Sequence, residues 1–530
     1  MNRPEIEQFV VTAEQMRAIE GRVFDAGMPV AALMEKVAGL VARRIQELYP
    51  IADTRLRVGV LVGPGHNGGD ALVIARELFL RGYQVSIYCP FAKLKQLTQY
   101  HADYAASLGI PFYQKIDPLE NYDLFVDGLF GFGLERPITE PLVTAIAFLN
   151  TWSKPILSID IPSGLHTDTG AVLATAICAT HTFCLGLWKL GLLQDQALDY
   201  IGTVELVDFD LPLKDIEAVL GSAPTIRRIT TDAAMSGLPL PRPNTAHKYQ
   251  LGHLLLICGS RKYSGAAILA GLGARASGVG MLSMAVPNSL KCLLTRYLPE
   301  ALAIDCPETE SGAIADLPPD IDLSAYDAIA CGPGLTMEPV DLVKQLLQSD
   351  RHLLLDADAL NILAQLDPPA ILSQRRSATI LTPHPGEFRR LFPDLSSDLS
   401  NRVAVAQTAA QQSGATIVLK GAKVAIAHPN GRVGINPHST PALARGGSGD
   451  VLTGLMGGFL ARGWPMTKSA VGAVYLHGLA ADLLAEDMGQ TGILAGELLD
   501  VIPELMDSLA GGAWPLETPP LHEAVYHTRL

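Results

Sequence analysis

The stretch "RVGVLVGPGHNGGDALVIAREL", residues 57 to 78, indicates how the first half of the chain folds. An apolar run at residues 58–62 predicts a buried strand, a glycine-rich turn follows, and the rest has a helical pattern. The turn, Gly63 to Gly68, spells G-x-G-x-x-G, with which dinucleotide-binding folds hold a pyrophosphate at a helix N-terminus. The stretch therefore predicts a strand–turn–helix unit of a parallel α/β sheet, with an anion-binding loop at its centre.

A nicotinamide dehydrogenase would carry an acidic residue about 20 positions further on, at the end of the next strand. Here the next predicted strand, "QVSIYCP" (84–90), ends without an acid, and Asp70 lies inside the loop, where it would repel a pyrophosphate. The simpler alternative is a tight turn that only needs glycine conformations. We expect the loop to bind an anion, and we do not expect a dehydrogenase.

Length and composition indicate a folded protein of at least two domains. The chain has 530 residues, of which 48% are hydrophobic and 18% charged. Its 54 acidic and 40 basic residues give a net charge of −14, which argues against a general nucleic-acid partner. The seven scattered cysteines form no C-x-x-C pair, and neither a secretory signal nor a membrane-spanning window is present. We expect a cytoplasmic protein with free thiols and no membrane partner.

Strand-like apolar runs alternate with helical patterns through both halves of the chain. The first half opens with a helix that Thr12 and Gln15 would cap. A segment with five prolines and little strand pattern, residues 210–250, is typical of a crossover, and after it the alternation restarts. A helical region spans about residues 449–508, and a loose tail follows at 517–530. The fold class is α/β: two αβα sandwich domains, residues 1–222 and 223–530, each with a largely parallel sheet.

Acidic residues follow two further strands of the first half. Asp127 ends the run "LFVDG", and Asp160 ends "LSID", with Ser163 just beyond it. Carboxylates at adjacent strand ends can hold a cation or transfer protons, although each could also simply cap a turn. Two of them beside an anion loop favour a functional site.

Four motifs in order, "GPGHNGGDALVIARELFLRGYQV", "VDGLFGFGLERP", "SIDIPSGL" and "HTFCLGLWKLGLL", resemble the YjeF N-terminal family, the NAD(P)HX epimerases, over residues ~10–215. The resemblance implies a Rossmann-like fold, interconversion of the R and S epimers of hydrated NADH or NADPH (NADHX, NADPHX), and a K⁺ ion. It implies proton transfer by Asp160 and K⁺ ligation by Asn67, Asp127 and Ser163. The residues implied to contact the hydrated dinucleotide are His66, Asn67, Gly68, Gly69, Asp70, Gly131, Phe132, Gly133, Leu134, Glu135, Arg136, Pro137 and Asp160. His66 and Ala71 depart from the family's usual Asn and Gly.

The second half contains the motif "PALARGGSGDVLTGLMGGFLARG". Gly446 to Gly449 would form an amide-rich turn before an apolar helix, an arrangement that binds anions. Asp450, at the helix start, could accept a hydroxyl proton as that hydroxyl attacks a phosphoryl group, or it could only cap the helix. Other predicted strand ends supply "CGPGL" (331–335) and four chemically useful side chains, Asp356, Asp358, His384 and Glu387, together with Lys420. We favour catalysis.

These motifs resemble the ribokinase-like fold and, more narrowly, the YjeF C-terminal family over residues ~223–510. Members are ADP- or ATP-dependent NAD(P)HX dehydratases that need Mg²⁺, and the bacterial ones use ADP. The resemblance implies phosphorylation of the substrate hydroxyl by ADP, elimination of phosphate, and release of NAD(P)H with AMP. It makes Asp450 the base, places Ala267, Gly334, His384 and Asp450 at the S epimer, and places Lys420, Gly421, Ala422, Lys423, Val424 and Gly449 at the nucleotide. Val424 and Arg445 depart from the family's usual residues.

The two resemblances together predict a bifunctional metabolite-repair enzyme whose partners are NADHX, NADPHX and ADP. We also expect a homo-oligomer. The alternative is a ribokinase-like kinase for a small hydroxylated metabolite, with a first half that is a sensor or another non-catalytic binding or assembly module.

Overall fold

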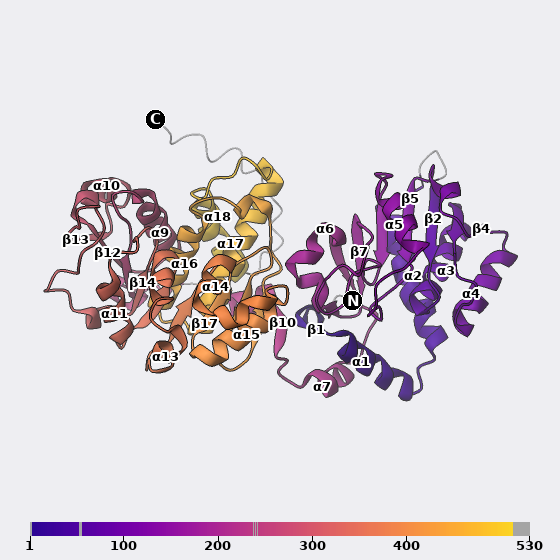
Figure 1. Cartoon of the computed structure of the whole chain (residues 1–530), viewed down its shortest axis with the longest axis horizontal. Helices are drawn as coiled ribbons and strands as arrows, with labels where there is room; N and C mark the ends of the chain where they lie inside the picture. The colour runs from indigo at the N-terminus through magenta and orange to yellow at the C-terminus, as the bar shows by residue number, and fades with distance from the viewer. Residues whose placement is uncertain (1–2, 52–55, 237, 239, 241, 512–530) are drawn as a thin grey trace. The chain divides into compact units, whose positions relative to one another are not determined.

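The chain forms two compact units, which meet in the sequence between Arg227 and Arg228 (Figure 1). The structure is a computed structural model that describes residues 3–51, 56–236, 238, 240 and 242–511. The tail expected at residues 517–530 lies outside the described residues. Each unit has its own sheet with helices on both faces, as the alternating pattern predicts.

The first unit is built on seven strands in which every neighbouring pair is parallel. Their spatial order is β4 (Phe112–Tyr113), β3 (Gln84–Tyr88), β2 (Arg57–Val62), β5 (Leu124–Gly128), β6 (Ile156–Ile159), β7 (His181–Leu185) and β9 (Thr203–Val207). From β2 the chain continues to β3 on one side and later to β5 on the other. Ligands bind at such a switch point, beyond the carboxyl ends of the strands.

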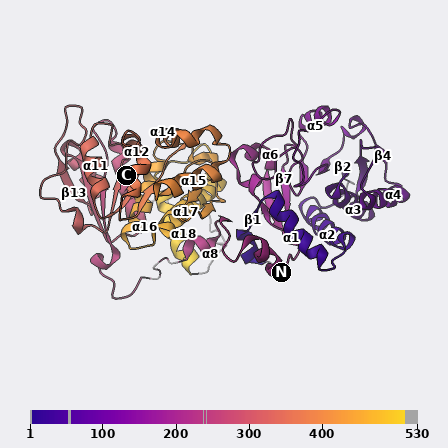
Figure 2. The ribbon, with the colours of Figure 1, turned by 60° about the horizontal axis from the view of Figure 1, so that its bottom comes forward.

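Helices of the first unit lie on both faces of this sheet. α1 (Ala13–Asp25), α2 (Val30–Leu48), α3 (His66–Leu80) and α4 (Gln96–Ser107) share one core cluster, whereas α5 (Leu142–Asn150) packs into a second cluster on the opposite face (Figure 2). Thr12 and Gln15 form the predicted capping box of α1. A small parallel pair joins β1 (Val10–Val11) to β8 (Trp188–Lys189), while α6 (Leu198–Ile201) and α7 (Leu213–Leu220) complete the unit.

The second unit is built on a ten-stranded sheet. Its strands from β13 to β17 pair in parallel, whereas the pairs β17–β18 and β18–β19 are antiparallel. The order is β10 (Ile226–Arg228), β19 (Val433–Ile435), β18 (Ala425–Ala427), β17 (Thr416–Leu419), β16 (Thr379–Leu381), β15 (His352–Leu355), β14 (Ala328–Cys331), β11 (His253–Ile257), β12 (Met281–Pro287) and β13 (Leu302–Cys306). Its switch point lies between β11 and β14, so their carboxyl ends flank a second crevice.

One face of the second sheet carries helices that share a large core: α9 (Ser264–Ala276), α16 (Ser448–Ala461), α17 (Met466–Met488) and α18 (Leu498–Ala510). Figure 2 shows α11 (Val340–Gln348), α12 (Ala357–Leu363) and α14 (Pro385–Leu391) on the other face. The remaining helices are α8 (Thr231–Met235), α10 (Lys291–Tyr297), α13 (Pro368–Ser373) and α15 (Arg402–Ser413).

The structure adds detail to two expectations about this half. The segment 210–250 is not only a crossover, because residues Ile226–Arg228 form β10 at the edge of the ten-stranded sheet. A strand of three residues is too short for an alternating pattern to be recognised. The helical region at 449–508 is three helices, broken after Ala461 and after Met488. Within the part of the chain that the structure describes, no helix has the length and apolar character needed to cross a membrane.

Candidate active sites

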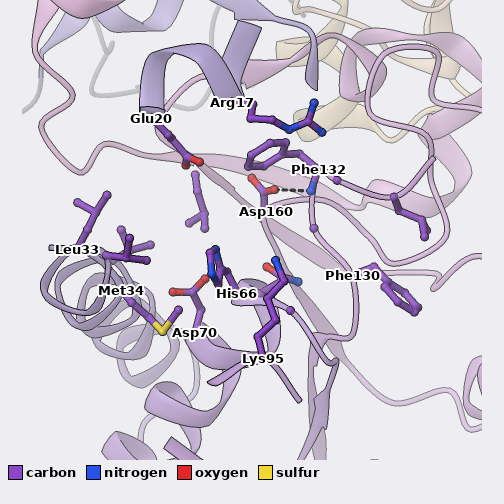
Figure 3. A pocket seen from close by; sticks show the side chains of 18 of the residues that line it. Arg17, Glu20, Leu33, Met34, His66, Asp70, Lys95, Phe130, Phe132 and Asp160 are labelled. Atoms are coloured by element: carbon purple, nitrogen blue, oxygen red, sulfur yellow. Dashed lines mark hydrogen bonds between the residues drawn. The ribbon is translucent and has the colours of Figure 1, made fainter. Parts of the chain in front are cut away.

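A cavity of about 1080 Å³ lies beyond the carboxyl ends of β2, β5 and β6 in the first unit (Figure 3). Apolar side chains of α1 and α2, including Leu33 and Met34, form one wall, and the first turns of α3 and the loop after β5 form others. The predicted substrate residues that line it are His66, Asn67, Asp70, Gly131, Phe132, Gly133, Leu134, Glu135, Arg136 and Asp160. Strand ends far apart in the sequence thus build one site.

Three predicted residues, Gly68, Gly69 and Pro137, are not part of this lining. The helix α3 begins already at His66, so the two glycines are buried in its first turn rather than in a loop. A Cβ atom on Gly68 would lie 1.9 Å from the Gly63 carbonyl oxygen. The glycine at this position therefore permits close packing between the turn and the helix.

Asp160 occupies a strained and tightly held position at the end of β6. Its backbone has a φ of 71°, in the left-handed region that side chains other than glycine seldom adopt. One carboxylate oxygen, Oδ2, accepts a hydrogen bond of 2.9 Å from the Phe132 amide, and the other lies 2.5 Å from Lys189 Nζ. The Lys189 side chain is completely buried. Burial alone would lower the pKa of Lys189, but Asp160 outweighs this effect, and the pKa lies above its ordinary value.

Two further carboxyl groups face the same cavity (Figure 3). Burial raises the pKa of Glu20 to about 7; Lys189 opposes this rise, and Asp160 adds to it. Burial, with Asp160 and Glu20, also raises the pKa of Asp70 well above its usual range. Burial and Lys95 lower the pKa of His66, which favours the neutral imidazole. At neutral pH Glu20 is therefore about half protonated, and it lies in the same cavity as the Asp160–Lys189 ion pair.

Asp127 is fully buried in β5 and hydrogen-bonded through both carboxylate oxygens. It accepts from the Ser163 hydroxyl (2.6 Å), the Ser163 amide (2.9 Å) and the Ser158 hydroxyl (2.8 Å). Burial nevertheless raises its pKa above the ordinary value. The Asn67 side chain lines the cavity, and its Oδ1 would lie 3.2 Å from a Cβ atom on Gly131 in the loop after β5. Asn67, Asp127 and Ser163 can supply only hard oxygen ligands to a cation, a donor set that fits K⁺.

The candidate site of the second unit is centred on the start of α16. Gly447, with a φ of 95°, precedes the helix, and Asp450 lies in its first turn. His477 of α17 fixes this turn, because its Nε2 donates to the Ser448 carbonyl at 3.0 Å. Burial raises the pKa of Asp450 to about 7; Asp356 adds to the rise, and Lys420 opposes it. A carboxylate with such a pKa is well suited to exchange a proton at neutral pH.

Lys420 and Asp356 form an ion pair beside this turn. Lys420 Nζ, at the end of β17, lies 2.7 Å from Asp356 Oδ1, at the end of β15. The Thr453 hydroxyl, one helical turn after Asp450, donates to Asp356 Oδ2 at 2.7 Å. Burial would raise the pKa of Asp356, but Lys420 and the hydrogen bonds hold it below its ordinary value. Asp356 therefore ties α16 to two strand ends.

The loop after β16 places His384 and Glu387 next to each other. His384 caps α14, because its Nδ1 accepts a hydrogen bond from the Gly386 amide at 2.9 Å. The Glu387 carboxylate accepts one from the His384 amide, which completes a capping box. Burial raises the pKa of Glu387 to about 7 despite the opposing charge of Lys420. Gly334, with a φ of 62°, follows β14, and Ala267 is buried in α9.

The predicted nucleotide segment, residues 420–424, joins β17 to β18. A Cβ atom on Gly421 would lie 2.1 Å from Arg402 Nη1, so only glycine fits there unless Arg402 moves. The Lys423 side chain donates to the Pro437 carbonyl, and Val424 packs against the core. Gly449 lies close to both Lys420 and Asp356, which joins this segment to the α16 turn. The unusual Arg445 donates to the carbonyls of Ile493 and Thr491.

Sequence reasoning missed four contributors to these sites: Arg17, Glu20, Lys189 and Thr453. Lys189 lies in a quoted motif, but only the pairing of β8 with β1 reveals its orientation. Glu20 and Arg17 precede Asp160 by more than a hundred residues, and the helix that carries them has a capping box but no motif that indicates chemistry. Only the tertiary fold brings such residues together.

Comparisons with known proteins find relatives for both halves of the chain. A family model described as NAD(P)H-hydrate dehydratase matches residues 254–504, and one described as YjeF-related protein N-terminus matches residues 30–191. The bifunctional NAD(P)H-hydrate repair enzyme of Thermosynechococcus vestitus is 51% identical over 502 residues, covering 94% of this chain and 98% of that protein. The namesake from Synechocystis sp. is 50% identical over 495 residues, covering 93% and 94%.

Among solved structures, the ADP/ATP-dependent NAD(P)H-hydrate dehydratase of Bacillus subtilis, co-crystallised with ATP and Mg²⁺, is 36% identical. The match covers 53% of this chain and 97% of that one, with a TM-score of 0.47. Both family models and near full-length relatives therefore agree, and the chain belongs to the family of bifunctional NAD(P)H-hydrate repair enzymes.

Proposed function

We propose that the first unit interconverts the R and S epimers of NADHX and NADPHX, and that the second dehydrates the S epimer with ADP. The observation that supports this most is that one chain builds two different sites. One is a large cavity with the Asp160–Lys189 pair, and the other is a helix-start turn with Asp450 beside Lys420. A small-molecule kinase with a passive first half would have no need for a buried ion pair in that cavity.

In the second unit, Asp450 would accept the proton of the substrate hydroxyl as its oxygen attacks the β-phosphorus of ADP. The bond between this phosphorus and the AMP oxygen breaks, and AMP leaves. The C–O bond of the phosphorylated substrate then breaks, the departing phosphate takes a proton from the neighbouring carbon, and the ring double bond re-forms. Lys420 and the amides of the Gly446–Asp450 turn would hold the transferred phosphoryl group. Ala267, Gly334 and His384 would contact the S epimer, and residues 420–424 with Gly449 the nucleotide.

In the first unit, Asp160 would transfer a proton at the hydroxyl of the hydrated ring, held in place by Lys189 and the Phe132 amide. His66, Asn67, Asp70 and the loop 131–136 would contact the substrate, while Gly68, Gly69 and Pro137 would shape the surrounding backbone.

We expect one cation at each site. Asn67, Asp127 and Ser163 would hold K⁺, which when bound supplies positive charge beside the buried Asp127. The described residues contain no group of three or more His, Cys, Asp or Glu side chains placed for a metal. We therefore expect Mg²⁺ to bind mainly through ADP phosphates with one or two carboxylates.

We also place the reaction in the cytoplasm, because all seven cysteines are free thiols, as a reducing compartment favours. A homo-oligomer is supported by exposed apolar side chains at the β13 edge of the second sheet, Leu293, Tyr297 and Leu302. Light scattering of the purified chain tests this assembly; a monomer mass at micromolar concentration would refute it.

The test of function is the recovery of NADH, followed by its near-ultraviolet absorbance, from an epimer mixture of NADHX with ADP, Mg²⁺ and K⁺. We expect complete recovery with the unaltered chain, recovery of only the S fraction with Asp160→Asn, and none with Asp450→Asn. Parallel runs with ATP test the choice of nucleotide. A phosphorylated product that persists would support the kinase instead.

A further inference from the structure

The chemistry of epimerisation requires more than one proton-transferring group. Hydration of the ring places the hydroxyl on the carbon bonded to the ring nitrogen, and this hydroxyl projects from opposite faces in the R and S epimers. A single carboxyl group on one face cannot reach the hydroxyl on the other. The cavity of the first unit should therefore supply a second acid or base.

Asp160 is poorly placed to serve both faces, because each of its carboxylate oxygens is already held. Oδ2 accepts from the Phe132 amide at 2.9 Å, and Oδ1 lies 2.5 Å from Lys189 Nζ, whose side chain is wholly buried. The left-handed backbone at Asp160 restricts it further. Its carboxylate is thus fixed in one direction.

Glu20 reaches the same cavity from a different element. It projects from α1, whereas Asp160 extends from the end of β6, and Figure 3 shows both carboxyl groups directed at one part of the cavity. Among the described residues, the Glu20 side chain makes no hydrogen bond or ion pair. Its carboxyl group can therefore exchange a proton with a ligand without first breaking an internal contact.

The charged groups around Glu20 are consistent with this role. Arg17 lies on the same helix, Lys189 on β8, Asp160 after β6 and Asp70 on α3. Burial, opposed by Lys189 and assisted by Asp160, raises the pKa of Glu20 to about 7. The group can then give or accept a proton at neutral pH.

We propose that Glu20 is the second catalytic residue of epimerisation, acting on the ring face opposite to Asp160. On one face, a protonated carboxyl group gives its proton to the leaving hydroxyl. The C–O bond breaks, water forms, and the ring-nitrogen lone pair makes a C=N double bond. Water then adds to the carbon from the other face, and the electron pair of the C=N π bond returns to nitrogen. The second carboxylate takes a proton from this water. The step consumes no net water or proton and rests on the proposed epimerase function.

The experiment compares the full-length chain with its Glu20→Gln variant in H₂¹⁸O, without nucleotide so that dehydration does not occur. Epimerisation is followed by chromatography and ¹⁸O incorporation by mass spectrometry, each corrected for the uncatalysed rate. We expect Glu20→Gln to reduce kcat for epimerisation by about 100-fold or more. Exchange of oxygen without inversion, on the Asp160 face, should fall far less. The ratio of exchange to inversion should therefore rise by at least about tenfold.

Three comparisons separate this role from a structural one. Glu14→Gln, an exposed position on the same helix, should leave both rates unchanged. Glu20→Asp should retain part of the activity, and Glu20→Gln should lose the decline in kcat/KM that we expect of the unaltered chain above pH about 7. If exchange and inversion fall together in Glu20→Gln, or neither changes, Glu20 has no such role. If the unaltered chain does not epimerise, the proposed function itself fails.

Discussion

Asp160 and Lys189 form an ion pair that is almost completely removed from water, with exposed side-chain fractions of 4% and 0%. Separating such a pair costs more than its formation contributes, because the remaining charge stays buried without a partner. This property distinguishes the pair from the many surface ion pairs of the chain.

Lys189→Met should therefore be strongly destabilising, by about 3–5 kcal/mol for the first unit, and should reduce epimerisation by at least about tenfold. The matched control is Lys36→Met, which breaks an exposed pair with Asp210 (2.6 Å) and should cost no more than about 1 kcal/mol. Chemical denaturation and the nucleotide-free epimerisation assay measure both effects. Equal losses for the two variants would contradict the importance of burial.

Asp450 leads to a prediction about pH. Its pKa is raised to about 7, and only the ionised carboxylate can accept the hydroxyl proton. The kcat/KM of dehydration should therefore decline about tenfold for each pH unit below about 7 and level off above it. Steady-state rates measured with saturating ADP, from acidic to mildly alkaline pH, test this. A profile without an acidic limb would mean that Asp450 is not the base.

The residue scale is also where sequence reasoning reached its limit. Asp450, Lys420 and Asp160 could be predicted because each follows a recognisable strand or glycine turn. Glu20 and Lys189 could not, because their role depends on which side chains the fold brings together. The contact of Gly68 with a ligand stays a prediction, and the close approach of the Gly63 carbonyl to this glycine is a packing reason that the motif alone does not reveal.

At the scale of elements, α9 and α16 pack closely enough that glycine is needed at their contact. A Cβ atom on Gly454 would lie 1.8 Å from the Ala270 carbonyl oxygen, and one on Gly273 would lie 2.3 Å from the Val451 carbonyl oxygen. This contact fixes the direction of α16, and with it the position of Asp450.

Gly454→Ala should therefore push α16 away from α9, lower the melting temperature of the second unit, and reduce dehydration by at least about tenfold. Gly265→Ala on α9 is the control for folding, because nothing lies within 4 Å of its added Cβ atom. Differential scanning calorimetry and the ADP-dependent assay check both. An unchanged melting temperature for Gly454→Ala would show that the helices separate without cost.

Most elements could be predicted because their apolar runs are bounded by turn residues. The strand runs of the first half that were quoted above, residues 58–62, 84–90, 124–128 and 157–160, recur in β2, β3, β5 and β6. The strands that the sequence pattern did not predict are short or exposed. β10 and β19 have three residues each, and β13 has exposed positions that interrupt its apolar pattern.

On the scale of the whole molecule, each unit has its own sheet, core and candidate site, so the two reactions should be separable. An equimolar mixture of Asp160→Asn and Asp450→Asn chains should restore complete recovery of NADH, since the first variant retains dehydration and the second retains epimerisation. Neither variant alone should achieve this. Recovery that stays at the S fraction in the mixture would mean that the S epimer does not pass between chains.

The left-handed backbone at Asp160 also constrains how this enzyme can change over evolutionary time. Only glycine, asparagine and aspartate adopt such a conformation readily. A descendant that abandoned the chemistry but kept the scaffold, for example as a carrier or signalling module, should therefore drift to glycine or asparagine at this position and rarely to alanine or serine. Residue 160 can in this way serve as a marker of inactive paralogues in genome surveys.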